Sequence, residues 1–246
     1  NVPMNTVEGV DIQKVVDTAY QAGDAILNIY RTDDFGVEAK SDDSPLTLAD
    51  RAAHNVIVEG LRHTGIPMLS EEGRSIPLDE RKAWGMYWLI DPLDGTKEFI
   101  KKNGEFTVNI ALIKNNIPVF GVVYAPVLDK MYFGGTAIGS SFLIHEKGEK
   151  QELPQASEGS VSNLLKQRAC KIIASRSHQN QATIDFIKQF DDPELVSMGS
   201  SLKFMLLAEN KADVYPRFAP TMEWDTGAAD AVLQGVGRHV FQVTEQ

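Results

Sequence analysis

A short apolar run in the first half of the chain leads directly into two acidic residues. Residues 87–90 read YWLI and residues 91–96 read DPLDGT, so two carboxylates lie within four residues. The apolar run is typical of a buried strand, Pro92 favours extended backbone at Asp91, and Gly95 permits a turn that a side chain would obstruct. A buried strand that ends in such a turn indicates a sheet covered by other layers.

This acidic turn has two interpretations. Two carboxylates that converge on one turn repel each other unless a cation lies between them. Hard divalent cations bind oxygen ligands, and Mg²⁺ commonly uses a few carboxylates together with a substrate phosphate. Alternatively, Asp91 and Asp94 cap nearby backbone groups in an Asx-type turn, and taken alone the Asp-x-x-Asp-Gly pattern favours this structural role.

Three further acidic residues lie beside predicted element ends, and each has a structural alternative. Glu71 fits a solvated loop, Asp225 fits the first turn of a helix, and Asp50 fits a capping box that starts at Thr47. Taken together, four of the carboxylates would form a two-metal site, in which metal ions activate a water and stabilise a leaving oxygen. These four are Glu71, Asp91, Asp94 and Asp225.

No other site of equal coherence is visible in the sequence. The chain contains no phosphate-binding G-x-x-x-x-G-K-[ST] loop, no H-E-x-x-H pair and no G-x-S-x-G turn. Its 5 histidines show no metal-ligand spacing. The acidic set would repel a phosphate group, so metal ions are needed to bind one.

Hydrophobic periodicity predicts helices and strands along the whole chain. The predicted helices span residues 8–31, 48–62, 181–190, 201–210 and 225–236. The predicted strands span residues 87–90, 107–113, 118–124, 130–133, 171–174, 195–198 and 213–215. Residues 145–165 show no clear pattern. We therefore expect an N-terminal α+β half over residues 1–145 and a C-terminal α/β half over residues 146–246.

Composition narrows the class of protein further. The formal net charge is −10, which argues against broad binding to nucleic acid or to anionic membranes. No run of 18 apolar residues is present, so no integral membrane segment is expected. A single cysteine excludes an intrachain disulfide framework and favours a reducing compartment. We expect a cytoplasmic protein, at most peripheral to the inner face of the membrane.

The acidic motifs resemble those of a known family. The segment at residues 91–96, with Glu71-Glu72 before it and Trp224-Asp225 near the C-terminus, resembles the inositol monophosphatase superfamily of Mg²⁺-dependent, lithium-sensitive phosphomonoesterases. Five stretches look closer still to its 3′(2′),5′-bisphosphate nucleotidase branch. They are residues 87–113, 121–126 (GVVYAP), 174–178 (ASRSH), 199–204 (GSSLKF) and 215–217 (YPR).

The resemblance covers about residues 10–240 and implies a layered αβαβα sandwich of the sugar-phosphatase type. It also implies two or more Mg²⁺ ions at an active site between the two halves. The first ion would be held by Glu71, Asp91 and the main-chain carbonyl of Leu93, and the second by Asp91, Asp94 and Asp225.

The same resemblance assigns roles around these ions. Gly95 and Thr96 would bind the phosphate, and Asp50 would act with Thr96 to orient and deprotonate the attacking water. Glu71, Leu93, Asp94 and Asp225 would also border the substrate. The nucleotide contacts would come from His178, Ser200, Lys203 and Arg217. For Lys203 the structural alternative is a solvated lysine on an amphipathic helix.

The activity implied is hydrolysis of the 3′-phosphate of adenosine 3′,5′-bisphosphate to AMP and phosphate. The analogue 3′-phosphoadenosine 5′-phosphosulfate is an expected second substrate, which links the reaction to sulfate assimilation. One alternative is a sister phosphatase that acts on inositol monophosphate or fructose 1,6-bisphosphate. Another is a regulator that binds nucleotide or metal without turnover. The expected partner is a small molecule rather than a nucleic acid, and the oligomeric state is left open.

Overall fold

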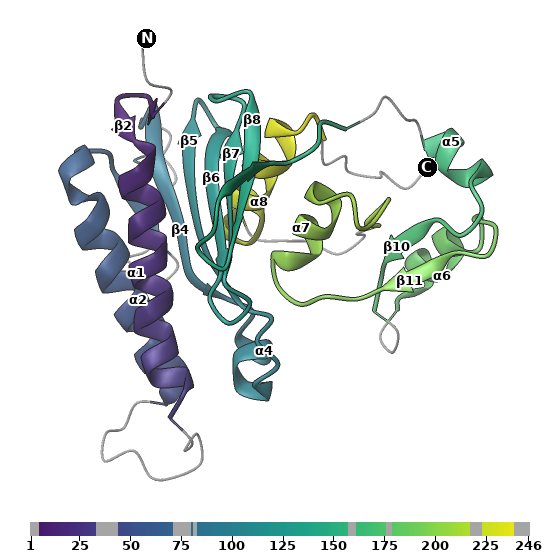
Figure 1. Cartoon of the computed structure of the whole chain (residues 1–246), viewed down its shortest axis with the longest axis horizontal. Coiled ribbons are helices and arrows are strands. Elements are labelled where there is room, and N and C mark those ends of the chain that lie inside the picture. The colour runs from purple at the N-terminus through teal and green to yellow at the C-terminus, as the bar shows by residue number, and fades with distance from the viewer. Residues whose placement is uncertain are drawn as a thin grey trace.

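The structure is a computed structural model that describes residues 5–32, 44–70, 80, 83–156, 161–175, 179–216 and 223–238, without the side chains of residues 161, 162 and 223–225. A seven-stranded sheet dominates it (Figure 1), in the order β3-β4-β5-β6-β7-β8-β9. Only the β3–β4 pair is parallel, and the other neighbours are antiparallel. The strands are β3 (Met68–Ser70), β4 (Met86–Asp94), β5 (Thr107–Lys114), β6 (Ile117–Ala125), β7 (Lys130–Gly135), β8 (Ser140–His145) and β9 (Lys150–Glu152).

Two helices cover one face of this sheet, α1 (Ile12–Tyr30) and α2 (Pro45–Leu61) (Figure 1). The buried side of α1 follows helical spacing, with Val15, Ala19, Ala22 and Ile26 all fully buried. A short hairpin, β1 (Thr6–Val7) and β2 (Val10–Asp11), precedes it. The helix predicted from residue 8 therefore begins only at residue 12, where the Asp11 side chain accepts a hydrogen bond from the Gln13 amide.

The start of α2 differs from the sequence prediction. Ser44, rather than Thr47, is the N-cap residue, and its hydroxyl accepts a hydrogen bond from the Thr47 amide over 3.2 Å. Pro45 takes the first helical position, where its missing amide hydrogen costs nothing. Asp50 is consequently inside the helix, and the predicted capping box from Thr47 to Asp50 is wrong. The 3₁₀ turn η1 (Arg62–Thr64) follows α2.

The opposite face of the sheet is covered by α8 (Glu223–Gly235), which contacts β4 to β8. The helix approaches the sheet closely, because Gly121 on β6 has no side chain: a Cβ there would lie 2.5 Å from the Ala228 carbonyl oxygen. The buried Ser141 hydroxyl donates a hydrogen bond to the Val232 carbonyl over 2.7 Å. Helix α7 (Leu202–Ala208) packs against α8.

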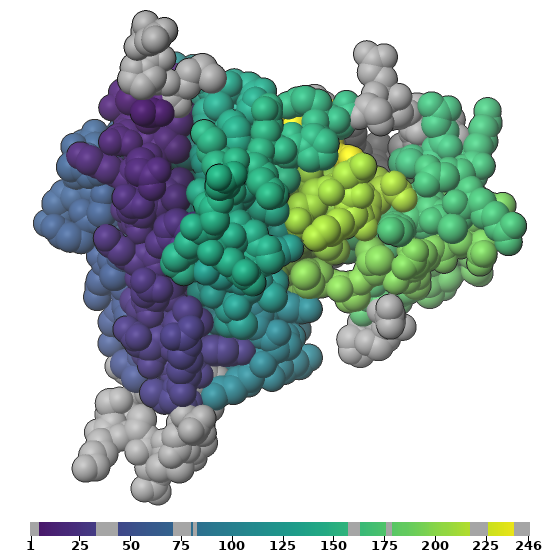
Figure 2. Space-filling model, viewed as in Figure 1, coloured from purple at the N-terminus to yellow at the C-terminus, as the bar shows by residue number. Residues whose placement is uncertain are grey.

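A smaller parallel pair of strands, β10 (Lys171–Ile173) and β11 (Glu194–Val196), lies beyond α7 with α5 (Val161–Lys166) and α6 (Gln181–Ile187) (Figure 1). The strand predicted at residues 213–215 is reduced to one bridge, between Val214 and Ile172. In Figure 2 this part and the large sheet form two blocks of atoms with α7 between them. The layers run helix, sheet, helix, sheet, helix, which confirms the predicted αβαβα sandwich.

The chain beyond residue 145 completes the large sheet as well as building the smaller one. Strand β9 continues the large sheet to Glu152, and α8 covers its second face. The division at residue 145 stays an interpretation. Several described elements had no counterpart in the prediction, among them β3, β8, β9, α5 and the six-residue helix α4 (Thr96–Lys101). Within the described ranges, no helix is long and apolar enough to cross a membrane.

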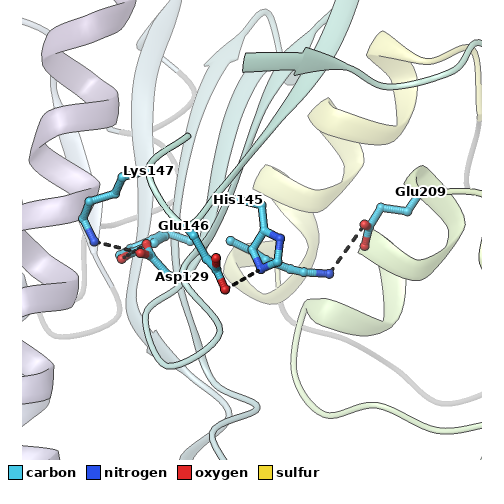
Figure 3. A network of polar contacts seen from close by, with 7 residues as sticks. Asp129, His145, Glu146, Lys147 and Glu209 are labelled. Carbon is cyan, nitrogen blue, oxygen red and sulfur yellow. Dashed lines mark hydrogen bonds and ion pairs between the residues drawn. The ribbon is translucent and has the colours of Figure 1, made fainter. Parts of the chain in front are cut away.

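A polar network joins the large sheet to the end of α7. The Tyr132 hydroxyl on β7 donates a 2.6 Å hydrogen bond to Glu209, and the Lys130 ammonium lies 3.5 Å from the other oxygen of that carboxylate. Burial and the Glu209 charge raise the pKa of Tyr132 above its ordinary value. Figure 3 shows Glu209 at one end of this network, with Asp129 and Lys147 paired at 2.9 Å at the other.

Helix α8 also carries a carboxyl group whose ionisation opposes folding. The Oδ1 atom of Asp230 is buried and has no hydrogen-bond partner among the described residues. Burial raises the pKa of Asp230 from 3.8 to about 6. The folded protein therefore binds the Asp230 proton more tightly than the unfolded chain does. The contribution of the protonated carboxyl to the free energy of unfolding is fully present below about pH 4 and is lost as the pH rises through about 6.

Replacing Asp230 by asparagine is therefore expected to stabilise the protein at neutral pH. The expected gain at pH 7.5 is about 2 kcal/mol in the free energy of unfolding, after allowance for partial exposure, and it should vanish near pH 4. Urea denaturation of the variant and the parent at both pH values measures the difference. The exposed Asp192→Asn change is the control and should have no such pH-dependent effect. A gain for D230N that is equal at both pH values would contradict the ionisation argument.

Candidate active site

The acidic turn lies at the end of β4, where pairing with β5 is irregular. Asp91 pairs with Asn109 and Asp94 pairs with Thr107, so three steps along β4 match two steps along β5. Side chains three residues apart on a regular strand point to opposite faces. The extra residue of this bulge brings Asp91 and Asp94 to the same side. Both carboxylates therefore lie on one side of the strand, and their role as metal ligands stays a prediction.

The surroundings of the two carboxylates differ. Asp91 is almost completely buried, with 2% of its surface exposed, whereas Asp94 is half-buried. The Leu93 side chain between them is buried in the core under α1 and α2, which leaves only its main chain for a role at the site. Buried carboxylates are retained where a cation or hydrogen bonds compensate their charge.

Hydrogen bonds converge on one oxygen of Asp94. Its Oδ2 atom accepts from the Ser201 amide at 2.8 Å and from the Ser201 hydroxyl at 2.7 Å. Longer contacts of 3.3 and 3.4 Å come from Asn109 Nδ2 and Thr107 Oγ1 on β5. The segment that begins at Gly199 is therefore in direct contact with the acidic turn, although it lies about a hundred residues later in the chain.

Gly95 makes the turn itself. Its φ is +95°, a left-handed conformation that favours glycine, and a Cβ there would lie 2.9 Å from the Ser200 Cβ. Thr96 follows as the first residue of α4 and is exposed. Gly95 and Thr96 thus lie at the surface end of a strand whose preceding residues are buried, where a phosphate has access.

Helix α2 brings Asp50 to the same region. Asp50 is half-buried, and α2 contacts α4, the helix that starts at Thr96. One turn after Asp50, the His54 Nδ1 atom lies 2.9 Å from the Ser70 hydroxyl at the end of β3. This contact ties α2 to the strand that leads into Glu71. Neither His54 nor Ser70 was singled out from the sequence, because nothing local to either residue indicates a partner 16 positions away.

Two of the predicted nucleotide contacts, Ser200 and Lys203, fall at the start of α7. Ser200 has a φ of +50° and a buried hydroxyl with no partner among the described residues. Lys203 is half-buried in the first turn of the helix. Glu71, His178 and Arg217 lie outside the described residues, as does the side chain of Asp225, whose backbone belongs to α8. Within the described part, no three His, Cys, Asp or Glu side chains could hold a metal ion.

The comparisons with known proteins identify the family. The model of the inositol monophosphatase family matches residues 10–246. The chain belongs to this family. It is also 45% identical to the 3′(2′),5′-bisphosphate nucleotidase CysQ of Salmonella typhimurium, over 93% of this chain and 89% of that protein. The CysQ of Escherichia coli K12 is 44% identical with the same coverage.

Solved structures agree with this placement in the family. The crystal structure of CysQ from Bacteroides thetaiotaomicron has a TM-score of 0.77 and 43% sequence identity, over 92% of this chain and 86% of that one. An inositol monophosphatase from Staphylococcus aureus has a TM-score of 0.69 at 20% identity, over 92% of this chain and 79% of that one. The second likeness shows the fold alone.

Proposed function

We propose that the chain is a Mg²⁺-dependent phosphomonoesterase that hydrolyses the 3′-phosphate of adenosine 3′,5′-bisphosphate to AMP and phosphate. The observation that carries the proposal is the bulge that brings Asp91 and Asp94 to one side of β4, in a chain 45% identical to a bisphosphate nucleotidase. The related phosphosulfate is a second expected substrate. A cytoplasmic role linked to sulfate assimilation is part of the same proposal.

The donor set fits Mg²⁺. Its described members are oxygen donors, the carboxylates of Asp91 and Asp94 and the carbonyl of Leu93 between them, and Mg²⁺ prefers oxygen ligands. With Glu71 these residues would hold one ion, and with Asp225 the two aspartates would hold a second. Bound metal would supply positive charge against the phosphate and the leaving oxygen. Lithium sensitivity belongs to the same proposal.

Three further residues of the site would orient the substrate and accept one proton. The backbone of Gly95 and the backbone and hydroxyl of Thr96 would donate hydrogen bonds to phosphate oxygens. Asp50 would accept the proton of the attacking water, with Thr96 holding that water in line. The contact between α2 and α4 supports this pairing, because it makes their helices neighbours.

The nucleotide would be held from the C-terminal half. Ser200 and Lys203 start the helix that abuts the acidic turn, and His178 and Arg217 would add contacts. In a protein of net charge −10, cations near a second phosphate group provide the attraction that most of the surface lacks. This arrangement would favour a bisphosphate over a simple monoester.

The first test is phosphate release in Mg²⁺ buffer from adenosine 3′,5′-bisphosphate and, in parallel, from inositol 1-phosphate. We expect release from the bisphosphate that stops when EDTA removes the metal. Faster release from inositol 1-phosphate would contradict the proposed substrate but still agree with the proposed reaction, hydrolysis of a phosphomonoester. Absence of release from either would leave the non-catalytic regulator as the better interpretation.

Lys203→Ala tests the nucleotide site. We expect the KM for adenosine 3′,5′-bisphosphate to rise about tenfold or more, the size of one lost hydrogen bond to a charged group, with little change for simple monoesters. Lys188→Ala removes an exposed lysine after α6 and is the matched control. Equal KM changes for both classes of substrate would contradict the nucleotide assignment.

A further inference from the structure

Ser201 makes two hydrogen bonds to the same carboxylate oxygen. Its amide and its hydroxyl donate to Asp94 Oδ2 over 2.8 and 2.7 Å, and the residue is buried, with 1% of its surface exposed. Asn109 Nδ2 donates in turn to the Ser201 hydroxyl oxygen over 2.8 Å. Since that oxygen accepts from Asn109, its own hydrogen is directed to Asp94. The orientation of the Asp94 carboxylate is thereby fixed.

This contact does not arise from local helix capping. Serine at an N-cap usually accepts a hydrogen bond from an amide two or three residues later. Ser201 precedes α7 in that position, yet its side chain makes no capping hydrogen bond and its backbone is already helical, with φ −64° and ψ −10°. The hydroxyl is used on a carboxylate 107 positions away instead.

The neighbouring residues hold Ser201 in place. The Gly199 amide donates to the Glu105 carboxylate over 3.0 Å. Ser200 has a left-handed φ of +50°. It lies close to Gly95, because a Cβ added to Gly95 would be 2.9 Å from the Ser200 Cβ. Three consecutive residues therefore contact the segment between Asp94 and Glu105, which makes the segment a rigid support for the carboxylate.

We propose that Ser201 is a positioning residue for the metal site: its hydroxyl and amide orient Asp94 toward the cation. Asn109 contacts both Asp94 and Ser201, and Thr107 contacts Asp94 and Asn109. The inference rests on the proposed metal-dependent function. It also connects the two halves of the site, because Ser200 directly before Ser201 and Lys203 two positions after it would hold the nucleotide. Residues that orient metal ligands typically change metal affinity by 10–100-fold when they are replaced.

The test measures metal binding by the full chain without substrate. Mn²⁺ is titrated into metal-free protein and followed by the electron paramagnetic resonance signal of the free ion, and Mg²⁺ binding is followed by calorimetry. We expect Ser201→Ala to weaken binding by about 10–100-fold. Thr107→Val removes a more distant hydroxyl at nearly constant shape, so we expect a smaller loss in the same direction.

Ser141→Ala is the matched control. Ser141 is also a buried serine with one strong hydrogen bond, but it donates to the Val232 carbonyl rather than to a carboxylate. We expect its metal affinity to equal that of the parent. Equal affinities for S201A and the parent, or equal losses for S201A and S141A, would overturn the positioning role. Absence of metal binding by the parent would instead overturn the proposed function on which the role rests.

Discussion

Replacing Asp91 by asparagine is expected to lower phosphate release from adenosine 3′,5′-bisphosphate by about 10³-fold or more. Asp91 is the carboxylate that would be shared by both metal ions, and loss of such a ligand removes several kcal/mol of transition-state stabilisation, at about tenfold per 1.4 kcal/mol. Asparagine has nearly the same volume, so the buried site at the end of β4 can keep its packing. Initial rates at saturating Mg²⁺ measure the loss.

The cause of the loss is tested through stability as well as rate. A ligand that binds only the folded protein raises its melting temperature, so Mg²⁺ should stabilise the parent more than D91N. Asp17→Asn removes the same charge from an exposed position on α1 and should leave both rate and Mg²⁺ response unchanged. A D91N protein with the parent rate would show that the acidic turn is structural, the Asx-type alternative that its sequence also fits.

The strand and its acidic end were predictable because their signal is local. An unbroken apolar run before Asp91 predicts a buried strand whatever its neighbours are. The bulge that turns Asp91 and Asp94 to the same side depends instead on the register between β4 and β5. No property of residues 91–94 alone specifies that register, so the sequence predicts the donors without their arrangement.

The same distinction applies to the serines of the site. Ser201 begins the helix predicted over residues 201–210, and nothing in that segment indicates a carboxylate partner. Its contact with Asp94 joins residues 107 positions apart. His54 and Ser70 are similar, since their contact depends on how α2 lies against β3. Short elements such as α4 were missed because six residues do not complete two turns of helical periodicity.

A side chain at Gly121 is expected to have a large effect on stability, because the distance between α8 and the sheet depends on its absence. A Cβ at Gly121 would lie 2.5 Å from the Ala228 carbonyl oxygen, 2.9 Å from the Ala228 Cα and 2.9 Å from the Ala231 Cβ. Two of these atoms are backbone, so a side-chain rotation cannot relieve the contact. The whole helix has to move away from β6, which separates apolar surfaces buried on both sides.

We therefore expect Gly121→Ala to lower the free energy of unfolding by about 1–3 kcal/mol, the usual range for an overpacked core. Urea denaturation in the presence of EDTA measures this cost without any contribution from bound metal. Gly85→Ala is the matched control, because a Cβ at Gly85 meets no atom within 4 Å. Its free energy of unfolding should stay within about 0.5 kcal/mol of the parent.

The displacement of α8 should also reach the active site. Asp225 lies on α8 one turn before Ala228, the residue that a Cβ at Gly121 would push. If Asp225 is a metal ligand, the G121A protein that remains folded should bind Mg²⁺ more weakly, whereas G85A should bind it normally. A destabilised G121A protein with unchanged Mg²⁺ affinity would contradict this link. Gly121 would then set the packing of α8, and Mg²⁺ binding would not depend on the position of that helix.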